Sequence, residues 1–180
     1  MDLEPTNHWR SPRIELFVLR PALVTQDYVD WLNDPLVNRF LESRFRRHDL
    51  DGTREFVAQA LADPAVLFTG IRTRADGRHV GNIKLGPIDR QHRLGEVGIL
   101  IGRVAWGQGI ASEAIGLLAR IAAAELGVRK LSAGCYAANT GSERAFVRAG
   151  FAVEGRRPAH VLLDGRPEDT ILLGRLLQPN

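Results

Sequence analysis

Hydrophobic residues in this chain follow two different periods, and the changes of period mark the expected elements. An apolar run at residues 14–20 predicts a first strand. After it, apolar positions three and four residues apart predict helices, which end at Asn33-Asp34-Pro35 and at Asp63-Pro64. The helices expected in this part of the chain are residues 21–32, 35–41 and 53–61.

From residue 65 onwards the apolar positions alternate in the manner of strands. Two short turns interrupt them, one at Ala75-Asp76-Gly77 and one around residues 89–93. Because short connections join antiparallel neighbours, this part predicts an antiparallel meander. The three strands expected are residues 65–73, 79–88 and 94–102.

The last part of the chain combines both periods. Apolar residues between Ile110 and Leu126 form one helical stripe, which Gly127 ends. A strand at 128–136 then follows a helical crossover, so we expect it to lie parallel to the strand before the helix. A helix at 142–149 and strands at 151–157 and 170–176 complete a mixed α/β domain, with a turn at Asp164-Gly165 between these strands. We expect one domain over 13–177, between tails at 1–12 and 178–180.

The turn before the long helix carries the strongest chemical signal. It reads Trp106-Gly107-Gln108-Gly109-Ile110-Ala111, and two glycines one residue apart let the backbone approach a ligand closely. The helix that follows directs its unpaired N–H groups and positive dipole end at the same place, which suits a phosphate. The two familiar nucleotide motifs are absent, because Ser112 replaces the third glycine of Gly-x-Gly-x-x-Gly and no Gly-Lys-Ser/Thr follows.

Composition narrows the function classes. At 180 residues, with 44% hydrophobic and 25% charged, the chain can bury a full core. Cys135 is the only cysteine and the five histidines are scattered, so we expect neither a disulfide nor a metal site. No signal-peptide pattern or long apolar run is present, which favours a cytoplasmic protein without a membrane segment. The net charge of +3 comes almost wholly from arginine, and we favour an anionic ligand over nucleic acid as its reason.

Several motifs together resemble one known superfamily. They are Gly95-Glu96-Val97-Gly98-Ile99, the segment from Trp106 to Ala114, Asn139 with Ser142, Gly150-Phe151 and Glu154-Gly155. In these positions the chain resembles the Gcn5-related N-acetyltransferase (GNAT) superfamily, whose members transfer acetyl from acetyl-CoA to an amine. It looks most like the branch that acetylates ribosomal-protein N-termini, while residues 80–88 also resemble members that act on sugar nucleotides.

The resemblance implies a fold and a cofactor site. The fold is a twisted, mostly antiparallel sheet of six to seven strands with about four helices and a splayed parallel pair at the acetyl-CoA site. Strand backbone and Asn139 would hold the pantetheine arm, and the glycine turn the pyrophosphate, although asparagine is equally a favoured helix cap. The cofactor-binding residues expected are Ile99, Leu100, Ile101, Gly107, Gln108, Gly109, Ile110, Ala111, Ser112 and Asn139, with no metal.

The chemistry suggests two catalytic residues. At pH 7 an acceptor amine with a pKa of about 10.4 costs about 4.6 kcal/mol to deprotonate, whereas a thiol leaving group of pKa about 8.5 costs about 2 kcal/mol. Glu96 is therefore the candidate base, directly or through a water, and Ser142 the candidate acid, with Tyr136 in reserve. The tyrosine acid of many relatives is replaced by Phe146. The alternative, non-catalytic interpretations are that Glu96 is an exposed surface residue and that Ser142 belongs to a helix cap.

Several alternatives stay open at this point. We favour a peptide N-terminus or a nucleotide-linked amino sugar as the acceptor, because the positive charge disfavours polycations. A small-amine (polyamine or aminoglycoside) acetyltransferase is the alternative. A non-catalytic acyl-CoA-binding regulator and a nucleic-acid-binding module are rival functions, and the protein is a monomer or a homodimer. Arg144 and Arg148 are either ribose-phosphate ligands or ordinary surface residues. Aromatic residues that either shape the acceptor pocket or belong to the core are Trp31, Phe40 and Phe45.

Overall fold

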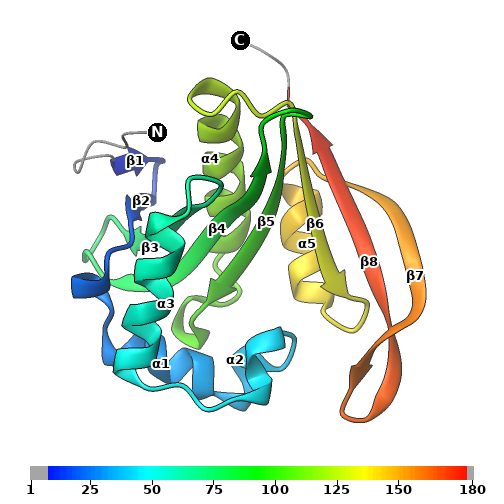
Figure 1. Ribbon diagram of the computed structural model, residues 1–180, viewed down its shortest axis with the longest axis horizontal. Helices are drawn as coiled ribbons and strands as arrows, with labels where there is room; N and C mark the ends of the chain where they lie inside the picture. The colour runs from blue at the N-terminus through cyan, green and yellow to red at the C-terminus, as the bar shows by residue number, and fades with distance from the viewer. Residues whose placement is uncertain (1–7, 178–180) are drawn as a thin grey trace.

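The computed structural model describes residues 8–177, which form one eight-stranded sheet with helices on both faces (Figure 1). The strand order is β1-β2-β3-β4-β5-β6-β8-β7, and all neighbours in it are antiparallel except β5 and β6. The strands are β1 (His8–Arg10), β2 (Ile14–Val18), β3 (Leu67–Thr73), β4 (His79–Asp89), β5 (Leu94–Ile101), β6 (Lys130–Tyr136), β7 (Ala152–Leu163) and β8 (Arg166–Leu176).

Five α-helices and three short 3-10 helices accompany the sheet in this described part. α1, α2 and α3 lie on one face, and α4 and α5 cover the other (Figure 1). None of the described helices is long and apolar enough to cross a membrane. The helices are η1 (Pro21–Leu23), α1 (Gln26–Asn33), α2 (Pro35–Asn38), η2 (Glu42–Phe45), α3 (Leu50–Ala62), η3 (Arg103–Ala105), α4 (Ile110–Ala124) and α5 (Thr140–Arg148).

Two hydrophobic clusters hold these layers together. The larger one joins α4 and α5 to the sheet, and its fully buried members include Ile115 and Leu118 of α4 and Leu131 of β6. The smaller one lies on the opposite face and includes Phe17 of β2, Trp31 of α1 and Val57 of α3. Each large apolar side chain buried in this way contributes about 1.5–3 kcal/mol, so the sheet is anchored from both sides.

The one parallel pair opens into a fork. β5 and β6 pair only between residues 94–96 and 130–132, although both strands continue beyond that point. From Val97 to Ile101, therefore, none of the described strands pairs with the β6 side of β5, while β4 still pairs along its other side. The expected splayed parallel pair and mixed α/β fold are confirmed, and unpaired backbone groups on β5 are left for a ligand.

The strand and helix counts differ from expectation. The sheet has eight strands rather than six to seven, because His8–Arg10 forms β1 inside the expected tail at 1–12. This three-residue strand has no apolar pattern. Its place is fixed by pairing with β2, by a hydrogen bond between His8 and Glu15 at 2.9 Å and by an ion pair between Arg10 and Glu15 at 2.8 Å. Residues 1–7 and the expected tail at 178–180 lie outside the described residues. The five α-helices correspond to the five helical stretches expected from the sequence, one more than the about four that the resemblance implies.

Some helix and strand boundaries differ from those expected, because helix caps or strand pairing determine them. α3 begins at Leu50 rather than 53 because the Asp49 side chain accepts a hydrogen bond from the Gly52 N–H at 2.8 Å. β7 continues to Leu163 rather than ending at 157, and β8 starts at Arg166 rather than 170. The two strands form one long hairpin around the expected Asp164-Gly165 turn.

Candidate functional site

A cavity of about 540 Å³ lies where β5, α4 and α5 meet the segment around α2. It lies beside the fork, because Ile99 and Ile101 belong to the stretch of β5 that β6 does not pair. Two of the predicted site residues, Glu96 and Gln108, do not line it. The predicted residues that the structure brings together around the cavity are residues 99–101, Gly107, residues 109–112, Asn139 and Ser142.

The glycine turn has the conformation that an anion site needs. Gly107 and Gly109 have φ values of 73° and 75°, in the left-handed region that side chains disfavour. No atom lies within 4 Å of where a Gly107 Cβ would stand, so the turn presents bare backbone. Gly109 caps α4 without a side-chain hydrogen bond, and the first N–H groups of a helix have no partner within it. Unpaired backbone donors at the positive end of α4 therefore border the cavity.

A charged cluster behind the turn holds it in place. Glu113 accepts hydrogen bonds from the Ser11 hydroxyl at 2.7 Å and the Arg13 Nε at 2.7 Å, so its carboxylate is directed away from the cavity. The same Arg13 donates from Nη1 to the Gln108 carbonyl at 2.7 Å. Burial alone would raise the pKa of Glu113, but these hydrogen bonds outweigh it and lower the pKa. Gln108 belongs to this support, since its amide also donates to the Val104 carbonyl at 2.8 Å.

The start of α5 forms the facing side of the cavity. Asn139 is the helix cap, because its Oδ1 accepts a hydrogen bond from the Ser142 N–H at 3.2 Å. Capping uses only the amide oxygen, and none of the hydrogen bonds among the described residues uses the Asn139 Nδ2. Ser142 does not cap the helix with its side chain, and it lines the cavity. Both side chains thus have a polar group available for a ligand.

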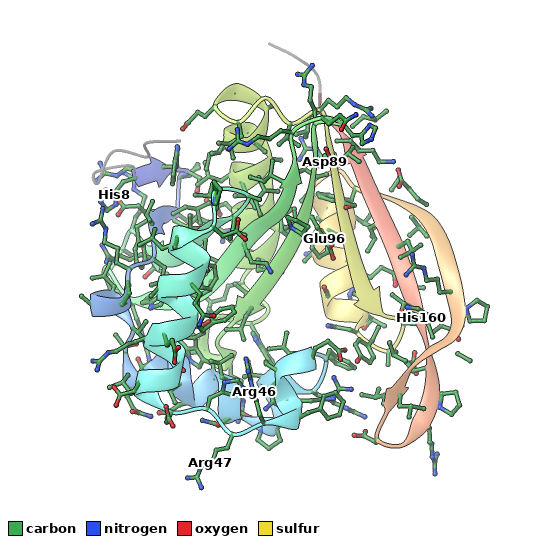
Figure 2. The ribbon with its side chains drawn as sticks, viewed as in Figure 1. His8, Arg46, Arg47, Asp89, Glu96 and His160 are labelled. Carbon is green, nitrogen blue, oxygen red and sulfur yellow. The ribbon has the colours of Figure 1, made fainter. Side chains whose placement is uncertain are left out.

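Glu96 lies on the other face of the sheet. Val97 and Ile99 point to the face of the sheet that α4 covers. Because side chains alternate along a strand, the exposed Glu96 points to the opposite face, where none of the described helices lies beside β6. Glu96 pairs with Ser132 at the last rung before β5 and β6 separate. Figure 2 shows Glu96 beside the opening between these strands, apart from Arg46 and Arg47 on the segment between α2 and α3. It does not meet Ser142 directly, and the fork separates the two.

Tyr136, the reserve acid, and Phe146, which replaces the usual tyrosine acid, have different surroundings. Phe146 is 2% exposed and packs against Phe151 with ring centres 5.0 Å apart, inside the core. Tyr136 donates its hydroxyl proton to Glu42 at 2.5 Å and stacks near Phe40, a cavity residue, without lining the cavity itself. Burial, and then the Glu42 carboxylate, raise the pKa of Tyr136, which keeps the phenol protonated.

α2 and the residues after it supply a wall of the cavity, of which the sequence suggested only Phe40 as a possible pocket residue. Leu36, Val37, Arg39, Phe40 and Leu41 line the cavity opposite the glycine turn. Of the three aromatics considered, only Phe40 is here, since Trp31 is buried in the smaller cluster and Phe45 is 73% exposed beneath Arg44.

Contacts across the molecule hold this wall in place. Arg39 pairs with Asp164 at 3.0 Å, and Arg44 donates to the Leu162 carbonyl at 2.9 Å. Both partners belong to the β7–β8 hairpin or its turn, more than a hundred residues later in the chain. The wall has one sequence signal, the helical spacing of Leu36 and Phe40, which is equally typical of a core stripe.

Comparison with known proteins identifies the class. A family model described as "Acetyltransferase (GNAT) domain" matches residues 16–152. The chain therefore belongs to the GNAT acetyltransferase domain family. The match includes β5, the glycine turn, α4 and the start of α5, the elements that surround the cavity.

Individual relatives agree with this family. The probable N-acetyltransferase YjcK of Bacillus subtilis (strain 168) is 33% identical over 112 residues, which are 62% of this chain and 61% of that protein. The chain spans less than two thirds of the curated relatives it matches, 57% of one and 61% of the other.

The solved structure of RimL, a ribosomal L7/L12 alpha-N-protein acetyltransferase in complex with coenzyme A, superposes with a TM-score of 0.85 at 18% identity, over 97% of this chain and all of that one. The spermidine N-acetyltransferase of Vibrio cholerae, in complex with CoA and spermine, gives 0.82 at 18% identity, over 93% and 97%. At these identities the two structures establish the fold.

Proposed function

We propose that this protein is an acetyl-CoA-dependent N-acetyltransferase that moves an acetyl group to a primary amine by direct attack in a ternary complex. The observation that carries the proposal is one cavity that contains both the anion-binding turn and the unpaired edge of β5. A cofactor with a pyrophosphate at one end and an amide-containing arm at the other needs both features. No cysteine lines the cavity to carry the acetyl group covalently, since Cys135 is buried within β6 and burial raises the pKa of its thiol to about 11.

The residues present fit coenzyme A. The N–H groups at the start of α4 suit the pyrophosphate, because Gly107 leaves open space where a side chain would stand. Backbone groups of residues 99–101 and the Asn139 Nδ2 suit the amides of the pantetheine arm. Bound there, acetyl-CoA supplies the activated acetyl group as a thioester.

Glu96 is the proposed base. It lies at the last pair before β5 and β6 separate. An amine that approaches from the uncovered face of β6 would therefore contact Glu96 before it reaches the opening between the two strands. Ile99 is three residues further along β5, about 10 Å at the rise of a strand, and a proton path to Glu96 would therefore use water. Removing the proton from an amine of pKa about 10.4 costs about 4.6 kcal/mol at pH 7, the larger of the two proton-transfer tasks.

Ser142 is the proposed proton donor to the departing sulfur. Its hydroxyl lines the cavity one helical turn from the Asn139 cap, on the side where the pantetheine arm would lie. Protonating a thiolate of pKa about 8.5 is worth only about 2 kcal/mol at pH 7, so a serine or a water that it orients is adequate. The substitution of Phe146 for a tyrosine is compatible with catalysis for this reason.

The acceptor is proposed to be a peptide N-terminus or a nucleotide-linked amino sugar. The similarity to RimL supports the peptide, and the positive charge of the chain supports an acceptor that is not a polycation. Glu42, the carboxylate at the α2 wall, already accepts a hydrogen bond from Tyr136 and lies 3.6 Å from Arg44, which leaves little negative charge for a polyamine. We include in the proposal a cytoplasmic location and either a monomer or a homodimer.

The test is release of CoA thiol from acetyl-CoA with four acceptor classes: peptide N-termini, nucleotide-linked amino sugars, polyamines and aminoglycosides. We expect one of the first two classes to be active and Glu96→Gln to lower kcat by about a hundredfold or more. Glu55→Gln, an exposed carboxylate on α3, is the matched control and should match the unmodified protein. CoA binding without turnover in any class would favour the alternative, a non-catalytic acyl-CoA-binding regulator.

A further inference from the structure

The ionisable side chains that line the cavity are all arginines, namely Arg39, Arg144 and Arg148. No aspartate or glutamate between residues 8 and 177 lines it, so the cavity combines arginine charge with the positive ends of α4 and α5. The glycine turn and its backbone N–H groups are sufficient for a pyrophosphate. The arginines are an additional anion-binding element that a pyrophosphate does not require.

Two of these arginines remain available for a ligand. Arg39 is engaged, since it pairs with Asp164 at 3.0 Å. Arg144 donates only its Nε, to the Thr140 carbonyl at 3.2 Å, and keeps both terminal nitrogens for other partners. Arg148 is exposed and makes none of the hydrogen bonds or ion pairs recorded between residues 8 and 177.

Their spacing brings the two guanidinium groups together. Arg144 and Arg148 are four residues apart on α5, so they are neighbours on one face of the helix. Two like charges at this spacing destabilise a helix unless an anion lies between them. Arginine also suits a phosphate better than lysine does, because its planar fork donates two parallel hydrogen bonds.

We infer that Arg144 and Arg148 bind the 3′-phosphate of coenzyme A, an inference that rests on the proposed acetyl-CoA-dependent function. Of the phosphates of CoA, this monoester carries close to two negative charges at pH 7, since the second pKa of such a group is about 6. Ser112 at the turn and Arg148 line the same cavity, so one ligand can meet both. Arg148 lies nine residues beyond Asn139, about 13 Å along the helix, a separation that places it well away from the pantetheine end.

Arg148 also has a structural role that the experiment must separate. It lies in the last turn of α5, where a positive charge interacts favourably with the helix dipole. Loss of that interaction would lower the stability of the protein without changing its preference for a ligand that carries the 3′-phosphate. The decisive quantity is therefore the ratio of the dissociation constants of CoA and 3′-dephospho-CoA, which differ by this phosphate alone.

The experiment is calorimetric titration of the protein with CoA, 3′-dephospho-CoA and adenosine 3′,5′-bisphosphate. We expect CoA to bind about tenfold to a hundredfold more tightly than 3′-dephospho-CoA, in keeping with two charge-assisted contacts. Arg144→Gln and Arg148→Gln should each reduce this preference, and the double variant should abolish it. Arg120→Gln, an exposed arginine on α4 that does not line the cavity, is the matched control and should keep it.

The outcomes separate this inference from the proposed function. Equal binding of the two ligands by the unmodified protein would overturn the inference and leave the acetyltransferase proposal intact. An equal loss of affinity for both ligands in the double variant, with circular dichroism unchanged, would also overturn it. Absence of any CoA binding by the unmodified protein would overturn both proposals together.

Discussion

The cavity has two walls that are built in opposite ways. The turn between β5 and α4 is held by contacts that need few side chains: left-handed glycines, a helix start and the Arg13–Glu113 support. The wall at α2 consists of four apolar side chains and Arg39, and the contacts that hold it are Arg39 to Asp164 and Arg44 to the Leu162 carbonyl. The first wall binds through backbone, whereas the second presents side chains.

This difference suggests a division of labour. Backbone groups cannot be changed by substitution, so the turn suits the part of the ligand that stays the same, the cofactor. Side chains on a short helix and its following segment vary easily, so the α2 wall suits whatever distinguishes one acceptor from another. Changes at the turn should therefore affect cofactor binding, and changes at the α2 wall should affect the acceptor.

The largest effect is expected from a side chain placed in the turn. In Gly109→Ala, a Cβ at φ of 75° costs about 1–2 kcal/mol, and it would stand 3.4 Å from the Arg13 guanidinium. We expect the free energy of unfolding to fall by about that amount and the affinity for CoA to fall about tenfold, measured by denaturant titration and calorimetry.

Gly116→Ala is the matched control for this substitution. Gly116 lies inside α4 with no atom within 4 Å of the added Cβ, so alanine should raise the stability by up to about 1 kcal/mol and leave CoA binding unchanged. If Gly109→Ala bound CoA as well as the unmodified protein, the turn would not be the phosphate site.

The support behind the turn should give the next largest effect. Glu113→Gln keeps the shape but weakens the contacts with Ser11 and Arg13, and because Arg13 is half exposed we expect a loss of about 1 kcal/mol. The pKa of Glu113 in the folded protein lies below its ordinary 4.5. The stabilisation that the ionised carboxylate provides is therefore present above pH 4.5 and is lost as the pH falls through the pKa of the folded state. In Glu113→Gln, the free energy of unfolding should therefore fall less between pH 7 and pH 3 than it does in the unmodified protein. A parallel loss in Glu113→Gln and Glu55→Gln would contradict this role.

The same contrast explains how far the sequence predicts the molecule. β5, the glycine turn and α4 were predicted because their signals are local: alternation, paired glycines and a helical stripe. The α2 wall was not predicted, because it depends on Arg39 and Arg44 meeting a hairpin more than a hundred residues away.

The hairpin itself shows a second limit. β7 extends through exposed residues such as Arg156, Arg157 and Pro158, and a strand with little buried surface has no hydrophobic alternation. Its length is set by pairing with β8, which no local pattern records. The position of Glu96 at the last paired rung of the fork, likewise, depends on where β5 and β6 separate, which its neighbours in sequence do not record.

The cluster beneath the α2 wall should make stability depend on pH. His79 lies against Phe17 and Trp31, and its Nε2 is 2.9 Å from both the Gly81 carbonyl and the Asn82 Oδ1. Burial lowers the pKa of His79 below its ordinary 6.5, although these hydrogen bonds act in the opposite direction. The unfolded chain therefore takes up the proton first, so stability should be full above pH 6.5 and fall as the pH drops below it.

Thermal unfolding between pH 8 and 5 measures this dependence. His79→Gln keeps an amide donor without a titrating group, so it should lower the stability at pH 8 and flatten the curve below pH 6.5. An unchanged slope in the variant would show that the pH dependence comes from elsewhere. CoA affinity at pH 7 should change little, because the cluster supports the acceptor side.

The smallest effect is expected from the ion pair that ties the α2 wall to the hairpin. Arg39 and Asp164 are 3.0 Å apart, but their side chains are 51% and 70% exposed, so solvent screens most of the attraction. A double-mutant cycle with Arg39→Ala and Asp164→Ala should give a coupling of about 0.2–1 kcal/mol in the free energy of unfolding. If the wall serves the acceptor, either single change should raise the KM for the amine while the dissociation constant of CoA stays within about twofold. A coupling above about 2 kcal/mol, or an equal loss of CoA affinity, would mean that the α2 wall is as firmly built as the glycine turn and that the two walls do not divide the work.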